Sequence, residues 1–410
     1  MPDLVVFEDA AWSQFLPLAY WRALFDLRCG LDTLLDKIES ACAATAALAV
    51  RAPLAEVVSA RRQRPLVSAD AQRPRLYVNG RALVRQPIDL PLGSATWSGD
   101  ALVAAHVQAA VANRLTPAAL LDPAATRAAL AGARDEPLPA EAIQLIDYPW
   151  QLYHANAAEI CRQAARLRPG VSTAVVYPGA HLVGGQIHLA PGVRVLPGAV
   201  LDAEPGPIVV APTAGISANA SVQGPCFIGE NGLVQPTTIL RGGVTLGPSC
   251  KVGGELEGVI FQGFSNKQHH GFLGHSYVGE WVNLGAGTVN SDLKNTYGRV
   301  QVPVNGRLVD TGQTFIGALI GDHAKTGINT VLPTGCVVGF AANVFCSRHA
   351  PRFVPSFAWL TDEGLSRNDP AKALAVARTM AARRKISLST AEERLFTVVA
   401  ELAGSVELGD

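Results

Sequence analysis

Three histidines lie within seven residues of one another, at positions 269, 270 and 275. A neutral imidazole near pH 7 is suited to removing a proton from an attacking amine or hydroxyl, so this cluster predicts a general base. Solvated surface histidines are the plainer alternative. His270 and His275 also have the spacing of a zinc-ligand pair, but no histidine between His188 and His269 supplies a third ligand. Neighbouring strand residues point oppositely, so spacing does not choose between His269 and His270.

The histidines lie in a stretch, residues 169–355, where glycine and proline concentrate and aliphatic residues recur at every sixth position. Seven are in phase: Ile216, Val222, Ile228, Val234, Leu240, Leu246 and Val252. Six residues make one short strand plus one turn, and three such units close a triangular coil. The period therefore predicts a parallel β-helix over residues 169–355. Residues 291–316 leave the phase, and such an insertion is expected to project toward a neighbouring subunit.

The remaining segments flank this β-helix. Residues 1–138 are expected to form an α/β domain, with strands at 4–7 and 75–78 and helices at 31–40 and 101–113. Thr116-Pro117 and Asp122-Pro123 each pair an N-cap residue with a first-turn proline and predict two further short helices. Residues 139–168 are expected to be a linker carrying a helix over 150–168. Residues 356–410 form a helical extension, whose apolar stripe docks on the β-helix end or on a neighbouring subunit.

Composition excludes several classes of protein. The chain has 410 residues, with 34 basic and 34 acidic side chains, and only 17% of residues are charged where roughly 25% is common. A nucleic-acid partner or a polybasic membrane role is therefore not expected. The most apolar window, residues 41–50, is too short to span a bilayer, and no signal peptide is recognised at the start. We expect a cytoplasmic protein, and the 7 scattered cysteines favour reduced thiols.

Several short motifs within the β-helix resemble a known family. They are Arg241-Gly242-Gly243, Lys267-Gln268-His269, Leu273-Gly274, Val278-Gly279-Glu280 and Val282-Asn283-Leu284-Gly285-Ala286-Gly287-Thr288. Their order resembles the acetyltransferase half of the bifunctional enzymes that make UDP-N-acetylglucosamine, which acetylate glucosamine-1-phosphate and then uridylylate it. Ser265-Asn266-Lys267, Ser276-Tyr277-Val278-Gly279-Glu280-Trp281 and Phe353-Val354-Pro355-Ser356-Phe357 resemble more closely a bacterial branch of sugar nucleotidyltransferases within that family.

This resemblance implies a left-handed β-helix and a homotrimer, with acetyl-transfer sites between subunits. It makes His269 the general base, and Arg241 and Lys267 the cations that hold the sugar phosphate. Phe272 replaces a tyrosine near the substrate, and either Asn290 or Asp292 takes the place of a substrate-binding amide. These departures leave the sugar open. Acetyl-CoA would lie along coils that contain Ala286, Lys325 and Asn329.

The resemblance is weaker in the N-terminal segment. Arg22, Arg28, Gly30 and Lys37 correspond to the loop and cations that cradle a nucleoside triphosphate, although Arg28 and Lys37 could equally support the fold. Asn79 takes the place of a magnesium-binding aspartate, and an amide is a poorer magnesium ligand than a carboxylate. Asp147 could supply a further ligand for Mg²⁺.

The sequence thus predicts an acetyl-CoA-dependent N-acetyltransferase acting on an amino-sugar phosphate of the glucosamine-1-phosphate kind. It is fused to a sugar-1-phosphate nucleotidyltransferase-like domain that takes UTP or another NTP, in the synthesis of nucleotide sugars for cell-envelope precursors. Two alternatives stay open: a nucleotidyltransferase whose β-helix is only a trimerisation stalk, and a non-catalytic nucleotide-sugar-binding assembly protein.

Overall fold

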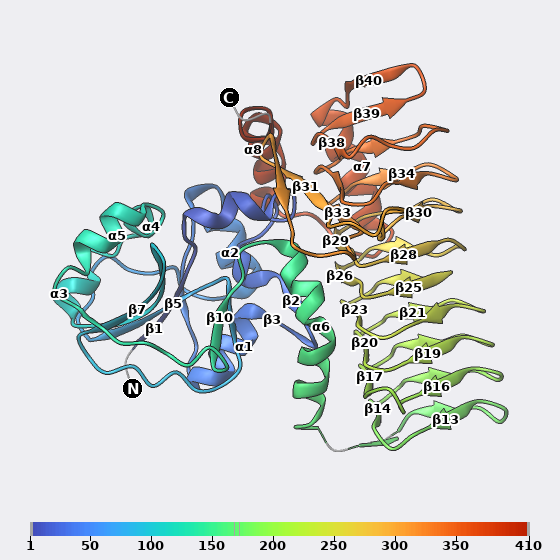
Figure 1. Ribbon diagram of the computed structural model, residues 1–410, viewed down its shortest axis with the longest axis horizontal. Coiled ribbons are helices and arrows are strands. Elements are labelled where there is room, and N and C mark those ends of the chain that lie inside the picture. The colour runs from blue at the N-terminus through green and yellow to red at the C-terminus, as the bar shows by residue number, and fades with distance from the viewer. Residues whose placement is uncertain (1–2, 168, 172, 408–410) are drawn as a thin grey trace.

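The computed structural model describes residues 3–167, 169–171 and 173–407. It shows an N-terminal α/β domain, a connecting helix, a long β-helix and two C-terminal helices (Figure 1). None of the helices in these residues is both long and apolar enough to cross a membrane.

The N-terminal domain is built on a six-stranded sheet of order β4-β1-β5-β8-β7-β9. Its strands are β1 (Asp3–Phe7), β4 (Ala47–Ala49), β5 (Arg75–Asn79), β7 (Ser94–Ser98), β8 (Ala101–Val107) and β9 (Arg134–Asp135). Strand β1 runs parallel to β4 and β5, whereas β8 is antiparallel to β5. The expected strands at 4–7 and 75–78 are confirmed. Two small ladders pair β2 (Arg28–Cys29) with β3 (Asp32–Thr33), and β6 (Ala82–Val84) with β10 (Ile143–Leu145).

Helices α1 (Leu34–Cys42) and α2 (Ala55–Arg62) belong to this domain, as do the short α3 (Ala109–Ala112), α4 (Pro117–Leu120) and α5 (Pro123–Ala129). The Thr116 hydroxyl accepts from the Ala119 amide, and the Asp122 carboxylate accepts from the amides of Ala124 and Ala125. Both N-caps are therefore confirmed. The connecting helix α6 is Pro149–Ala164, and Arg168, the last residue of the expected helix, lies outside the described residues.

The helix expected over residues 101–113 is wrong. Residues Ala101–Val107 form β8, and only Ala109–Ala112 are helical. Strand β8 lies between β5 and β7, where Ala104 and Ala105 are fully buried. Small side chains suit a strand that is covered on both faces, so packing in the sheet overrides the helix propensity of alanine.

The β-helix has three faces, each a parallel sheet. The first face has ten strands: β11 (Gly170–Val171), β14 (Ile187–Leu189), β17 (Ile208–Val210), β20 (Cys226–Ile228), β23 (Val244–Leu246), β26 (Ile260–Gly263), β29 (Tyr277–Glu280), β33 (Ala318–Ile320), β36 (Cys336–Val338) and β38 (Phe353–Val354). The second face has β12 (Val175–Val176), β15 (Arg194–Val195), β18 (Gly215–Ile216), β21 (Leu233–Val234), β24 (Lys251–Val252) and β27 (Asn266–Lys267), followed by β34 (Lys325–Thr326), β37 (Asn343–Val344), β39 (Ala358–Thr361) and the antiparallel β40 (Gly364–Arg367). The third face has β13 (His181–Val183), β16 (Val200–Asp202), β19 (Ser221–Gln223), β22 (Ile239–Leu240), β25 (Glu255–Glu257) and β28 (Phe272–Gly274), followed by β30 (Val289–Asn290) and β35 (Val331–Leu332).

The seven in-phase aliphatic residues all point into the β-helix, and each is 0% exposed. They stack on their counterparts in the next coil, as Ile216 does on Val234 and Ile228 on Leu246. The parallel β-helix predicted from the six-residue period is confirmed. Parallel pairing also continues beyond residue 355, because β39 pairs with β37.

The insertion does not project away from its own chain. It forms a hairpin of β31 (Gln301–Val304) and β32 (Arg307–Asp310), and the Asn305 side chain donates to the Ser13 carbonyl of the N-terminal domain. Val300 and Val302 are fully buried in the core that this domain shares with the β-helix. The hairpin thus packs in the interface between the N-terminal domain and the β-helix of its own chain, and the expectation that the insertion is directed at a neighbouring subunit stays a prediction.

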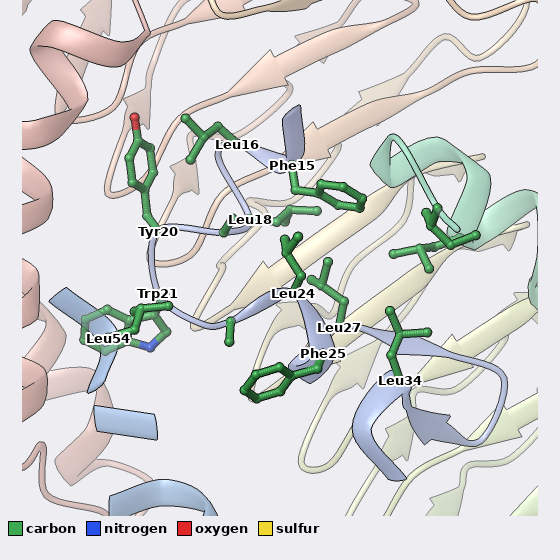
Figure 2. Packing of buried hydrophobic residues seen from close by; sticks show 14 of the residues in the cluster. Phe15, Leu16, Leu18, Tyr20, Trp21, Leu24, Phe25, Leu27, Leu34 and Leu54 are labelled. Carbon is green, nitrogen blue, oxygen red and sulfur yellow. The ribbon is translucent and has the colours of Figure 1, made fainter. Parts of the chain in front are cut away.

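Helices α7 (Pro370–Ala382) and α8 (Thr390–Val406) pack at the same interface between the N-terminal domain and the β-helix. Leu395 and Phe396 of α8 are buried in the shared core, and Phe396 packs against Phe340 at the end of the first face. In Figure 2 the apolar side chains of the loop over residues 15–27 crowd together, with Trp21 beside Leu54. The N-terminal domain thus covers the first face, as Figure 1 shows.

His323 is a buried histidine at this interface between the N-terminal domain and the β-helix. It is 1% exposed, and neither ring nitrogen has a hydrogen-bond partner in the described part of the chain. The rings of Trp21, Trp281, Phe340 and Phe396 lie around it. Burial holds the pKa of His323 well below 6.5, so the folded protein keeps this imidazole neutral.

We predict that His323→Phe stabilises the protein by about 1–2 kcal/mol at pH 7.5, because it removes two unpaired buried nitrogens. The neighbouring corner residues Phe264 and Trp281 already adopt positive φ, as His323 does, so the backbone accepts an aromatic ring there. The unfolded imidazole binds a proton below pH 6.5 and the folded one does not, so wild-type stability should fall as pH drops below 6.5, by roughly 1 kcal/mol at pH 5.5. Urea unfolding at both pH values should show a smaller loss in the variant; an equal loss would contradict this account.

Candidate functional site

His269 lies in the turn between β27 and β28, where the second face of the β-helix meets the third. Its side chain is exposed, and its ring makes no hydrogen bond to any residue that the structure describes. Gly271 shapes this turn: its φ is +123°, and a Cβ there would lie 2.3 Å from the Thr288 carbonyl oxygen. The turn therefore presents a free imidazole to solvent on a tightly fixed backbone. His270 is also exposed.

Arg241 and Phe272 lie beside this turn on the third face. Glu255 of β25 pairs with Phe272 in the ladder, and its backbone amide donates to the Gly271 carbonyl at 3.2 Å. The Glu255 carboxylate accepts from Arg241 Nε at 2.6 Å, while Glu257 lies 3.8 Å from the same nitrogen. The structure thus links Arg241, through Glu255, to Phe272, the first residue of the strand that follows the His269 turn. Sequence reasoning missed Glu255 and Glu257, although their alternation in Glu255-Leu256-Glu257 signals two outward carboxylates on one strand.

Lys267 is not on this surface. It stands in the inward column directly above Val252, is 1% exposed, and donates to the carbonyls of Gly253 and His269 at 3.3 and 3.0 Å. Burial lowers the pKa of Lys267 to about 8. The expectation that its ammonium holds a sugar phosphate is corrected, because internal carbonyls hold it and fix the turn that carries His269.

Asn290 and Asp292 are held by residues of the coil that contains Phe272. The Asn290 side chain accepts from the Gly274 amide at 2.8 Å and donates to the Gly274 carbonyl at 2.9 Å, so both ends of its amide support the backbone. Asp292 Oδ2 lies 2.8 Å from His275 Nδ1. Across from them, burial and then His275 lower the pKa of His154, on α6, to about 4. Of these residues, Asp292 and His275 form a partly exposed acid–base pair that sequence reasoning did not assign.

The three residues expected near acetyl-CoA lie in adjacent coils. The Asn329 amide donates to the Ala286 carbonyl at 2.7 Å, so these two positions stack directly. Lys325 is in the same coil as Asn329, and its ammonium donates to the His323 carbonyl at 2.8 Å. Burial lowers the pKa of Lys325 to about 8.

In the N-terminal segment, Arg22 does not face a nucleotide. It is 1% exposed, and its guanidinium forms a two-bond pair with Asp322 of the β-helix, at 3.1 and 2.5 Å, and also lies 3.1 Å from Glu280. Arg28 likewise contacts the β-helix, where its Nε donates to the Gln262 carbonyl at 3.0 Å. The nucleotide-binding expectation for Arg22 is corrected: its two terminal nitrogens are bound by the buried Asp322 carboxylate, and this pair joins the two domains.

Gly30 and Lys37 both contact α6. The Gly30 amide donates to Asn156 Oδ1 at 2.6 Å, and a Cβ at Gly30 would lie 2.2 Å from Gln163 Oε1. Lys37 Nζ lies 3.1 Å from Glu159 Oε2, and both side chains are buried. Gly30 is therefore required for close packing of the loop on the helix.

Asn79, Asp147, Asp9 and Arg81 meet near the carboxyl ends of β1 and β5. Arg81 Nε lies 2.9 Å from Asp9 Oδ2, and Arg81 Nη1 lies 2.6 Å from Asp147 Oδ1. Asn79 Nδ2 donates to Asp9 at 2.8 Å, and Asn79 Oδ1 accepts from the Arg81 amide at 3.1 Å. The oxygens expected to bind Mg²⁺ are thus already taken up by a guanidinium and an amide. These residues do not fit the ion, because an arginine cation stands between the two carboxylates.

A pocket of about 260 Å³ opens beside this cluster, with Asp9, Arg81 and Asp100 among its lining residues. Ligands of open α/β sheets bind outside the carboxyl ends of the strands, so the pocket is placed where a nucleotide would enter. Sequence reasoning missed Asp9 and Arg81, although Asp9 lies two residues after the buried strand β1.

Residues 4–171 match the family model of sugar nucleotidyl transferases. A bifunctional sugar-1-phosphate nucleotidylyltransferase/acetyltransferase of Sulfurisphaera tokodaii is 36% identical over 117 residues, which are 28% of each chain. The bifunctional protein GlmU of Acaryochloris marina is 30% identical over 176 residues, 42% of this chain and 32% of that one.

Among solved structures, the UDP-N-acetylglucosamine acyltransferase of Francisella novicida is 12% identical, with a TM-score of 0.30 over 55% of this chain and 91% of that one. The matched segments span about three tenths of the length of the two bifunctional relatives. The chain thus contains a segment, residues 4–171, that matches the sugar nucleotidyl transferase model, and it is similar over part of its length to bifunctional sugar-1-phosphate nucleotidylyltransferase/acetyltransferases.

Proposed function

We propose that the β-helix transfers the acetyl group of acetyl-CoA to the amine of an amino-sugar phosphate of the glucosamine-1-phosphate kind. The N-terminal domain takes UTP or another nucleoside triphosphate and acts on a sugar-1-phosphate. The setting is the cytoplasmic synthesis of nucleotide sugars for cell-envelope precursors. The observation that carries the acetyl-transfer proposal is the exposed imidazole of His269, which makes no hydrogen bond within the described chain and lies in the turn that Gly271 shapes.

The chemistry follows from these groups. The sugar amine attacks the thioester carbonyl, a C–N bond forms, and the C–S bond breaks to release the CoA thiolate. His269 takes the proton that the attacking amine loses, and Arg241 attracts the sugar phosphate. Backbone N–H groups of the coil stabilise the oxyanion of the tetrahedral intermediate. Acetyl-CoA lies along the stacked positions Ala286 and Asn329.

A homotrimer is part of the same proposal. The N-terminal domain covers the first face, which leaves the second and third faces for contacts between copies. Leu182, Val183 and Ile239 are exposed apolar residues on the third face, as expected of a surface that another copy covers. Light scattering on a sizing column gives the mass directly, and a monomer would contradict the trimer.

The test of the acetyltransferase is release of the CoA thiol by the purified protein, with acetyl-CoA and a panel of amino-sugar phosphates. Release that depends on one amino sugar supports the proposal and identifies the substrate. If no panel member causes release from folded protein, the acetyltransferase is overturned.

A second candidate is a nucleotidyltransferase with a non-catalytic β-helix. The internal roles of Lys267 and Asn290 favour it, because both were expected to bind substrate. The two candidates differ in their affinity for acetyl-CoA, because a non-catalytic β-helix does not bind it. Calorimetric titration with acetyl-CoA alone therefore distinguishes them.

We predict that Arg241→Gln raises the KM for the sugar phosphate roughly tenfold and leaves kcat nearly unchanged. The guanidinium contributes a charge-assisted contact to the phosphate, which is present before and during the reaction. Initial rates at varied sugar phosphate measure both constants. Arg194→Gln, on the lower coil strand β15, is the matched control and should behave as wild type. A fall in kcat at constant KM would contradict this role for Arg241.

A further inference from the structure

A small polar pocket of about 190 Å³ lies between α1, α6 and the segment after β6. Its lining comprises Asp32, Lys37, Ser40, Ala41, Val84, Arg85, Gln86, Pro87, Arg162, Gln163 and Arg166. Pockets for drug-sized ligands measure roughly 300–1,000 Å³, so this one suits a group of phosphate size. It shares no lining residue with the pocket at the carboxyl ends of β1 and β5.

Three cations of this pocket converge on one buried carboxylate. Glu159 is 1% exposed, and its oxygens lie 3.1 Å from Lys37 Nζ, 2.8 Å from Arg85 Nε and 2.7 Å from Arg162 Nη2. Burial raises the pKa of Glu159, but its arginine and lysine partners lower it to about 2. Glu159 is therefore a permanent anion, yet it supplies only one negative charge to three positive ones.

Arg166 adds a fourth cation, and among the described residues none pairs with its guanidinium. Asp32 is the other carboxylate of the pocket, and Gln163 donates to it at 2.5 Å. Four cations against Glu159 and Asp32 leave an excess of two positive charges. The C-terminal end of α6 offers only about half a negative charge, so the helix dipole does not account for the excess.

The donors that remain free suit a phosphoryl group. Arg85 and Arg162 use part of each guanidinium on Glu159, and both side chains are 24% exposed toward solvent. The Ser40 hydroxyl and the Gln86 amide also line the pocket and have no partner within the described segments. A phosphoryl dianion carries the two charges that are lacking and accepts hydrogen bonds from several donors at once.

We propose that this pocket binds a phosphoryl dianion, either inorganic phosphate or the phosphate of a small phosphorylated sugar. The ligand would link α1 to α6, the helix that leads into the β-helix. This proposal does not rest on the proposed function, because it concerns binding alone.

The test is calorimetric titration of the full chain at low salt with inorganic phosphate and, separately, with a hexose 1-phosphate. Arg166→Gln should weaken phosphate binding roughly tenfold. This arginine is exposed and unpaired, so the variant keeps its fold. Asp32→Asn removes a repelling charge and should tighten binding several-fold. Arg73→Gln, an exposed arginine before β5, is the matched control and should bind as wild type.

The opposite signs of the two pocket variants make the test specific. Phosphate binding that weakens in Arg166→Gln and tightens in Asp32→Asn supports the site. Displacement of phosphate by the hexose 1-phosphate then identifies a sugar phosphate as ligand, and its failure identifies inorganic phosphate. Absence of phosphate binding, or equal affinity in all variants, would overturn the proposal.

Discussion

Replacing His269 with alanine is expected to lower the kcat of acetyl transfer by about 10²-fold or more, because the amine then loses its proton to water. The side chain is exposed and makes no hydrogen bond within the described chain, so its removal should leave the fold and the melting temperature unchanged. Initial rates of CoA thiol release, beside a thermal melt of the same sample, measure both quantities.

His270→Ala is the matched control for His269. The two residues are adjacent and both exposed, but only one imidazole can take the amine proton. Activity should survive the His270 change nearly intact. If His270→Ala lost activity while His269→Ala kept it, the base would be assigned to His270. A loss of stability in His269→Ala would instead make this residue structural.

Asp322→Ala is expected to destabilise the protein by about 3–5 kcal/mol, the largest effect on stability that we predict. It strips the Arg22 guanidinium of its two-bond partner while leaving that cation buried, and a lone buried charge costs far more than the pair contributes. Glu280, at 3.1 Å, compensates only in part. Equilibrium urea unfolding measures the change.

Two reference variants distinguish the loss of the buried ion pair from the general effect of removing a carboxylate. Asp310→Ala removes an exposed carboxylate of the insertion hairpin and should change stability by less than about 0.5 kcal/mol. Arg22→Met combined with Asp322→Leu and Glu280→Gln removes all three charges and should recover most of the loss. A loss below 1 kcal/mol in Asp322→Ala would show that the pair does not hold the two domains together.

The β-helix could be predicted because its rule is local. Each strand has one inward aliphatic residue and each corner one small residue. This pattern repeats along the chain, so each coil can be recognised from its own residues. The expected N-caps Thr116 and Asp122 succeeded for the same reason: each acts on amides two or three residues away. The assignment of His269 as the base also rests on its immediate neighbours in sequence, and it stays a prediction.

The sites that failed depend on contacts between distant segments. Lys267 and Arg22 have the charge that a phosphate needs, but the same charge serves an internal carbonyl or the Asp322 carboxylate, 300 residues along the chain. Asn79 was judged by its place after a strand, whereas Arg81, two residues later, supplies the cation there. Residue type predicts which chemistry is available; only packing decides which partner receives it.

Because its coils are stacked by parallel strand pairing, the β-helix can change in length only by whole coils. Ile208 pairs with Cys226 and Cys226 with Val244, so one circuit here takes eighteen residues and raises the column by about 4.8 Å. Helix α6 contacts the column at β20, β23 and β29, above the circuits that contain β13, β16 and β19 (Figure 1). Whole circuits can therefore be gained or lost below β20 without changing the contacts that α6 makes with β20, β23 and β29.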